Sequence, residues 1–170
     1  MSMSLVQTVT IGAGGNTMIG FNNIPQVNGH LILVAALRGT NSTNNLSITL
    51  NNDTSTNYDY RLLQAAGSSQ STWSTTNAGF FSQAMNDPAA PTAAFGSLRC
   101  IIPRYTSAIA KTALIDGVTA YNSTTNGPLG LVSARWNNSS AVTSLQIRPD
   151  SGSFVQHSTA SLYICLLYTS

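Results

Sequence analysis

Apolar and polar residues alternate along most of this chain, and apolar residues at helical spacing are nearly absent. Alternation with a period of two is typical of half-buried β-strands. Ten segments are predicted to be strands: 5–11, 17–21, 30–38, 46–50, 58–62, 95–102, 111–118, 129–136, 142–147 and 160–167. Together they indicate an all-β fold, an antiparallel β-sandwich or jelly roll of about nine to ten strands, as a single domain over residues 1–170.

Glycine, proline and asparagine mark the breaks between these strands. The run Gly12–Asn16 predicts a hairpin turn; it faintly resembles a phosphate-binding loop, but no lysine follows it. Asn51 and Asn52 are expected to adopt left-handed backbone geometry in a second hairpin. The segment 30–38 is apolar at nearly every position, which predicts a central strand covered on both faces.

Residues 67–91 do not fit the alternating pattern. The segment opens with Ser and Thr, continues with Trp73, Phe80, Phe81 and Met85, and ends in prolines. We therefore expect a long, partly irregular loop. Loops of this length in compact domains usually have a function, which makes 67–91 a candidate segment for contacting a partner.

The chain is poor in charge: only 7% of its residues are charged, there is no Glu, and Lys111 is the single Lys. A hydrophobic content of 42% argues against disorder. The seven basic residues are scattered without a basic run, so we expect no nucleic-acid partner. The longest apolar run, 31–37, is too short to span a membrane, and no secretory signal is recognisable. We therefore expect synthesis in a cytosol.

Cys100 and Cys165 each lie in an apolar, strand-like run. They are either two small buried hydrophobic residues or a disulfide between strands, and their spacing does not match a zinc site.

The sequence contains few residues that could act in catalysis or bind a metal, since its acidic residues are five aspartates. Asp53 and Asp59 are the one pair close in sequence; they could act as a general acid and base, but Asp in a turn is the ordinary interpretation. With Asn51, Asn52, Thr54 and Asn57 they could also supply oxygen ligands to Ca²⁺, against the alternative of a hydrogen-bonded turn. His30 and His157 lack the nucleophile motif of a serine triad. We expect neither an enzyme nor a cofactor.

Four aromatic residues could stack on a sugar ring if they were exposed, although packing in a core or interface is the commoner use of such side chains. They are Trp73, Tyr105, Tyr121 and Trp136.

Several short motifs occur in an order that resembles a family of bacteriophage virion structural proteins. They are Phe21-Asn22-Asn23-Ile24-Pro25-Gln26 with His30-Leu31, Leu50-Asn51-Asn52-Asp53-Thr54 with Asn57-Tyr58, Ile102-Pro103-Arg104-Tyr105-Thr106 with Lys111-Thr112, Trp136 before Ala141-Val142-Thr143-Ser144-Leu145, and Ser158-Thr159-Ala160-Ser161-Leu162-Tyr163-Ile164.

This resemblance implies a structural role in a virion. The expected function is a capsid decoration (cement) protein on the outer capsid surface, a homotrimer that stabilises the shell by binding across major capsid subunits. The alternative is a tail-fibre or receptor-binding head domain that recognises host glycans. The residues expected at the interface are Met3, Leu5, Trp73, Phe80, Phe81, Met85 and Tyr105.

Overall fold

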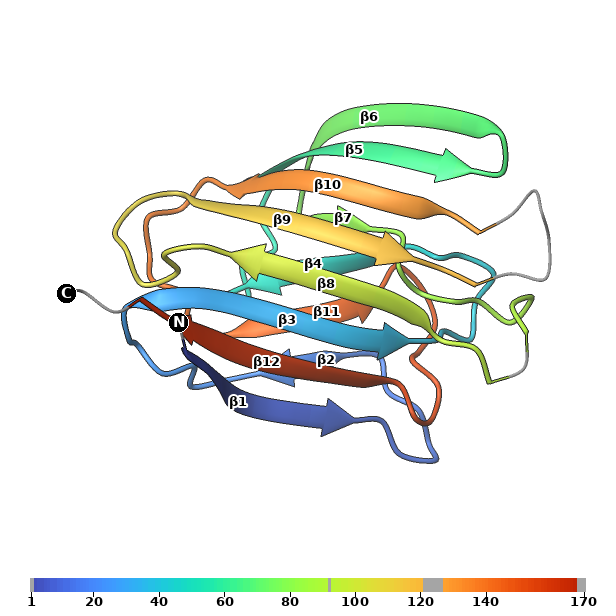
Figure 1. The fold of residues 1–170 in the computed structure, drawn as a ribbon, viewed down its shortest axis with the longest axis horizontal. Coiled ribbons are helices and arrows are strands. Elements are labelled where there is room, and N and C mark those ends of the chain that lie inside the picture. The colour runs from blue at the N-terminus through green and yellow to red at the C-terminus, as the bar shows by residue number, and fades with distance from the viewer. Residues whose placement is uncertain (1, 92, 121–126, 168–170) are drawn as a thin grey trace.

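Two antiparallel β-sheets stacked face to face make up the fold of the computed structural model (Figure 1), which describes residues 2–91, 93–120 and 127–167. The larger sheet contains, in spatial order, β1 (Ser2–Thr10), β12 (Thr159–Leu166), β3 (Gly29–Leu37), β8 (Gly96–Ile102), β9 (Lys111–Val118), β10 (Leu129–Trp136), β5 (Tyr58–Ala66) and β6 (Ser69–Asn77). The smaller sheet contains β2 (Ile19–Phe21), β11 (Leu145–Pro149), β4 (Leu46–Leu50) and β7 (Phe80–Ser82). The expected antiparallel sandwich is confirmed.

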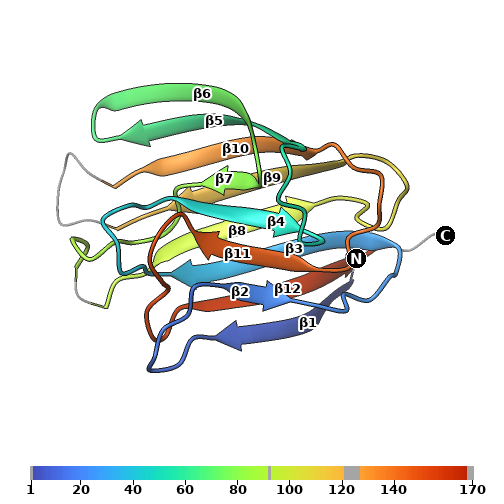
Figure 2. The same ribbon diagram turned by 180° about the vertical axis from the view of Figure 1, so that it is seen from behind.

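The core lies between the two sheets and is built from the inward-facing residues of both. Figure 2 shows the smaller sheet lying across the middle of the larger one, so that β6 projects beyond it. Tyr58 marks the centre of the aromatic part of the core: its ring stacks on Trp136 and meets Phe80 edge to face. The Tyr58 hydroxyl accepts the Leu50 N–H at 2.9 Å and so joins β5 to β4 in the other sheet.

The segment 67–91 is not the long loop that its composition suggests. It contains β6, which forms a hairpin with β5 through Gly67 (φ +56°) and Ser68, and then β7 of the smaller sheet. With these two strands the described part of the chain has twelve, two more than expected. The polar sequence of β6 hid it, because a strand exposed on both faces has no apolar alternation.

Both predicted hairpin turns connect different sheets instead. Asn51 (φ +53°) and Asn52 (φ +56°) adopt the expected left-handed geometry, but the turn carries the chain from β4 to β5 in the other sheet. The Gly12–Asn16 turn likewise links β1 to β2. Glycine and asparagine predict a change of direction, and they do not show which sheet the next strand joins.

Strand β3 is central in its sheet but covered on one face only. Leu31, Leu33, Ala35 and Leu37 point into the core, while Val34 on the opposite face is exposed. The expectation of cover on both faces is therefore wrong. The apolar residues on the other side of β3 belong to an open sheet surface, considered below.

The two cysteines are free and buried on opposite sides of the larger sheet. Cys100 lies opposite core residue Leu33, whereas Cys165 lies opposite His30 on the other face. The interpretation as buried hydrophobic residues is confirmed and the disulfide is not formed. Among the described residues there is no helix long and apolar enough to cross a membrane.

Candidate functional site

The outer face of the larger sheet, turned away from the core, carries the largest group of exposed apolar side chains in the described residues. Six aliphatic side chains on β3, β5, β9 and β10 are 44–53% exposed there, and we call them the aliphatic patch: Val34, Leu63, Leu114, Val118, Leu129 and Leu131. Contiguous apolar patches on a soluble protein usually mark a site of interaction.

Strand register brings these side chains together. Leu131 on β10 lies directly opposite Leu63 on β5, and Leu129 lies directly opposite Val118 on β9. Opposite residues of antiparallel strands share a face with their Cβ atoms about 5 Å apart. A shallow hollow of about 690 Å³ is lined in part by Leu63, Leu114 and Leu131. Five of the six side chains of the patch therefore lie together on the neighbouring strands β9, β10 and β5, and Val34 lies beyond β8 on β3.

Four of the charged side chains on this face form two ion pairs, whereas Arg61 has a hydroxyl partner instead. Arg99 on β8 contacts Asp116 on β9, with Nη2 and Oδ2 at 2.6 Å, and its Nε donates to Oδ1 at 3.1 Å. Arg135 on β10 donates its Nε–H to Oδ2 of Asp59 on β5 at 3.0 Å. Exposed pairs of this kind add little to stability. They do reduce the net charge that a partner would meet on this face.

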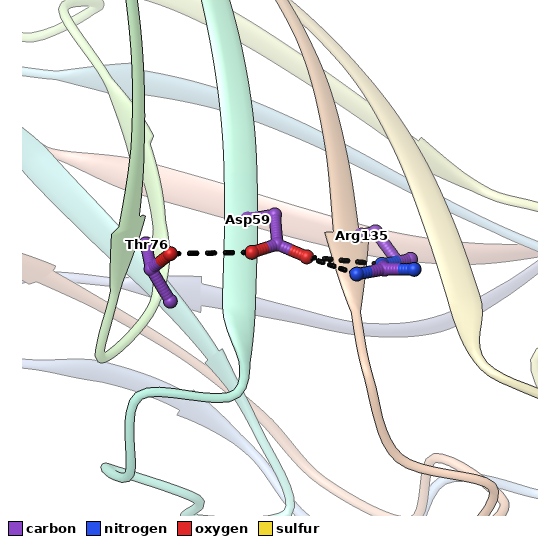
Figure 3. Close-up of polar contacts among 3 residues, drawn as sticks. All are labelled: Asp59, Thr76 and Arg135. Atoms are coloured by element: carbon purple, nitrogen blue, oxygen red, sulfur yellow. Dashed lines mark hydrogen bonds and ion pairs between the residues drawn. The ribbon is translucent and has the colours of Figure 1, made fainter.

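A second hollow, of about 700 Å³, lies over the same face toward β6 and is lined mainly by polar side chains. Asp59 lies in its wall between two neighbours (Figure 3): Thr76 Oγ1 donates to Oδ1 at 3.4 Å, and Arg135 occupies Oδ2. Arg61 Nη1 donates to Ser74 Oγ at 2.7 Å. The hollow offers hydroxyl groups and guanidinium N–H donors, with Asp59 as its single carboxylate. That set can bind polar groups but lacks the second carboxylate of a glycosidase.

The residues predicted for the interface fall into two groups. Met3 and Leu5 on β1 and Trp73 on β6 are exposed and available to a partner. Phe80, Met85 and Tyr105 are fully buried in the chain's own core, so the prediction is wrong for them. Phe80 lies on β7 of the smaller sheet, whereas Met85 and Tyr105 lie in the segments that follow β7 and β8, and all three belong to the core.

Phe81 has an intermediate position: its ring is half-buried and stacks on Tyr60, with ring centroids 5.4 Å apart.

The residues considered for stacking on a sugar do not meet at the polar hollow. Tyr105 and Trp136 are buried, and Tyr121 lies outside the described residues. Trp73 is exposed, but it lies opposite the buried Leu62 and thus on the core-side face of the sheet. The hollow therefore has no exposed aromatic platform among its lining residues.

The Asn51–Asn57 segment behaves as a hydrogen-bonded turn. Asp53 accepts hydrogen bonds from the Ser55 N–H, Asn57 and the Trp136 indole. A further hydrogen bond, from the Ser55 hydroxyl group to Oδ1 of Asp53, is the largest of the causes that hold the pKa of Asp53 far below its usual range. Asp59, the second carboxylate considered for catalysis or calcium, instead pairs with Arg135. Over the described ranges no three His, Cys, Asp or Glu side chains cluster as a metal site would require.

The histidines are also used locally: His30 Nδ1 accepts the Arg104 N–H at 3.1 Å, and His157 lies in a turn with φ +71°.

Sequence reasoning missed the aliphatic patch, although a signal for it exists. In β10, Leu129 and Leu131 alternate with Gly130 and Val132, so apolar residues fall on both faces of the strand. In an antiparallel sandwich one of those faces is outside. Where neighbouring strands carry apolar residues on both faces, the apolar residues on the outer face therefore indicate a surface that could contact a partner.

No protein-family model and no curated protein matches this sequence. Among solved structures, it is similar to the galectin LEC-6 of Caenorhabditis elegans, with 10% sequence identity, a TM-score of 0.37, and 91% of this chain and 94% of that chain covered.

Proposed function

We propose that this protein is a bacteriophage capsid decoration protein that binds neighbouring major capsid subunits through the outer face of its larger sheet. The observation that supports this proposal best is the aliphatic patch. The patch lies on paired strands rather than on loops, so a partner would meet a surface that is already ordered.

The size of the outer face suits a stable protein contact. Eight strands at their usual spacing span roughly 30 Å, and eight residues along a strand span roughly 25 Å. That area is on the order of the 800 Å² that each partner buries in a standard interface. Two of the three arginines on this face, Arg99 and Arg135, are already paired with aspartates, so a partner with apolar side chains would have to leave only Arg61 reaching solvent or a polar group.

Two measurements test the proposal. The first is the copy number of this protein in purified virions relative to the major capsid protein, by quantitative mass spectrometry. A ratio of the same order supports decoration, a few copies per particle point to the tail, and absence from the particle overturns both virion roles.

The second measurement is binding of purified protein to capsids that lack it. Leu131→Lys places an unpaired charge at the centre of the patch and should weaken binding at least tenfold. Thr56→Lys adds the same charge in the exposed turn before β5 and should bind as the wild type does. Equal binding by the two variants would place the contact on another surface.

A receptor-binding head domain that recognises host glycans is the second candidate, and the polar hollow beside β6 favours it. Its hydroxyl groups and guanidinium donors match the hydrogen-bonding groups of a sugar. Titration of glycans by calorimetry tests this role, and Arg135→Ala should remove the heat of binding. The trimer expected from the sequence stays a prediction that sedimentation equilibrium tests.

A further inference from the structure

The two sheets have four outer strands, and three of them are guarded against pairing with another chain. β2 and β7, the outer strands of the smaller sheet, have three residues each. β1 is longer, but its register shifts between Leu5 and Gln7. Short length and irregular register are two ways in which proteins prevent edge-to-edge association.

β6, the fourth outer strand, has none of these protections. It runs for nine residues, Ser69–Asn77, and pairs with β5 in continuous register from Ala66↔Ser69 to Tyr58↔Asn77. The strand contains no charged residue and no proline, and all nine residues are exposed. Along its free side, alternate residues direct their backbone N–H and C=O groups outward.

The five central residues of β6 are symmetric in residue type about its midpoint. Trp73 lies at the centre, two hydroxyl residues precede it (Ser71 and Thr72), and two follow it (Ser74 and Thr75). The Trp73 side chain is 46% exposed and lies on the same face as the buried Leu62.

We propose that the free side of β6 pairs, antiparallel, with β6 of a second copy of this chain, centred on Trp73. This register places Trp73 opposite Trp73 of the second copy, Thr72 opposite its Ser74, and Ser71 opposite its Thr75. A twofold contact requires every residue to suit its mirror position. In the five central pairs, hydroxyl residues lie opposite hydroxyl residues and Trp73 lies opposite Trp73, and no like charges face each other.

Pairing of this kind has a geometric consequence for the outer face. Opposite residues of antiparallel strands share a face, so the larger sheets of the two copies would form one continuous sheet. Both aliphatic patches would then lie on the same side of it. The inference does not depend on the proposed function, but it would give a capsid-binding protein two identical contacts and the gain in avidity that follows.

Cysteine crosslinking tests the register. Trp73→Cys should form a disulfide-linked dimer under mild oxidation, because the two new thiols face each other. Gln70→Cys faces Thr76 of the second copy and should not crosslink, whereas the double variant Gln70→Cys/Thr76→Cys should. The wild type controls for Cys100 and Cys165, which are buried and free.

Sedimentation equilibrium tests the contact without crosslinking. Wild-type protein should be dimeric, in contrast to the trimer that the resemblance implies, and a trimer would count against this contact. Trp73→Lys should raise the dissociation constant at least tenfold by placing like charges together at the twofold axis. Met3→Lys adds the same charge on β1 and should stay dimeric, as should Leu131→Lys on the aliphatic patch.

Three results would overturn the proposal. They are a wild type that is monomeric at every concentration, crosslinking of Trp73→Cys no faster than that of Gln70→Cys, and crosslinking of Trp73→Cys only to a different protein. If Trp73→Lys does not fold, the crosslinking comparison decides. A wild-type protein that forms the dimer but does not bind capsids would count against the proposed function alone.

Discussion

The indole of Trp136 donates its Nε1–H to Oδ2 of Asp53 at 2.7 Å and so ties the end of β10 to the turn between β4 and β5. The same carboxylate accepts the Ser55 N–H at 3.0 Å and an Asn57 amide hydrogen at 3.1 Å. One side chain thereby orders the turn and anchors it to the core aromatic residue that stacks on Tyr58.

This arrangement predicts acid sensitivity at Asp53. Its hydrogen bonds, that from the Ser55 hydroxyl group foremost, hold the pKa of Asp53 well below the ordinary 3.8. A group whose pKa is lower in the folded state stabilises the fold above its unfolded pKa and loses that contribution as pH falls below it. At pH 7 the free energy of unfolding of the wild type should therefore exceed that of Asp53→Asn, and the difference between the two proteins should become smaller below about pH 4. Urea unfolding at both pH values measures it, and a gap that does not change with pH would contradict the assignment.

A second prediction concerns Lys111, the single lysine, which is fully buried. Its Nζ donates to the carbonyl oxygens of Ser107 at 2.8 Å, Ile109 at 2.6 Å and Ser140 at 2.8 Å, and lies 5.9 Å from the centroid of the Trp136 ring. Lys111→Met would leave these carbonyl groups without their donor, and each such loss costs about 1–3 kcal/mol.

We therefore expect Lys111→Met to lower the free energy of unfolding by about 3 kcal/mol, measured by urea unfolding. Arg148→Met removes an exposed charge on β11 and should change it by less than about 0.5 kcal/mol. Equal effects of the two substitutions would show that the carbonyl contacts do not stabilise the fold.

Alkaline pH should destabilise the protein from about pH 9 upward. Burial raises the pKa of the Cys100 thiol from 9.0 to about 12, and it also raises the pKa of Tyr58, Tyr60 and Tyr105 above 10.0. Groups with raised values stabilise the fold below their unfolded pKa and lose that contribution as pH rises toward the folded one. Burial lowers the pKa of Lys111, which acts in the opposite direction just below pH 10.5.

Thermal unfolding between pH 7 and 11 measures this effect. We expect the unfolding temperature to fall above pH 9, and to fall less in Cys100→Ala because that variant has no buried thiol to titrate. Identical pH profiles for the wild type and Cys100→Ala would exclude the thiol as a contributor.

Part of the fold could be predicted from local patterns alone. The sequence predicts β4 with its observed bounds, because Leu46, Ile48 and Leu50 alternate with Ser47 and Thr49. β6 was missed because neither of its faces is buried, so its Ser and Thr residues resembled a loop. The alternation of apolar and polar residues reveals a strand only where one face of that strand is buried, so it does not reveal a strand such as β6 that lies outside the core.

The candidate site was harder to predict for a related reason. Asp59 and Arg135 are 76 residues apart in sequence, and only the pairing of β5 with β10 brings them together. The aliphatic patch depends likewise on the register of separate strands. From the sequence alone, an apolar residue such as Val34 on the second face of β3 suggests that another layer of structure covers that face. The described part of the chain has two sheets and no such layer, so the residue is exposed.

The last prediction concerns Gly117 on the inner face of β9, where the chain that follows β7 crosses the sheet. A Cβ atom added at Gly117 would lie 2.3 Å from Cβ of Ala84, whereas one added at Gly12 meets nothing within 4 Å. Gly117→Ala should therefore force the two segments apart and lower the free energy of unfolding by about 1–3 kcal/mol. Gly12→Ala has open space and should change it by less than about 0.5 kcal/mol. Urea unfolding of both variants measures the difference, and a Gly117→Ala protein as stable as Gly12→Ala would mean that Ala84 does not pack against β9.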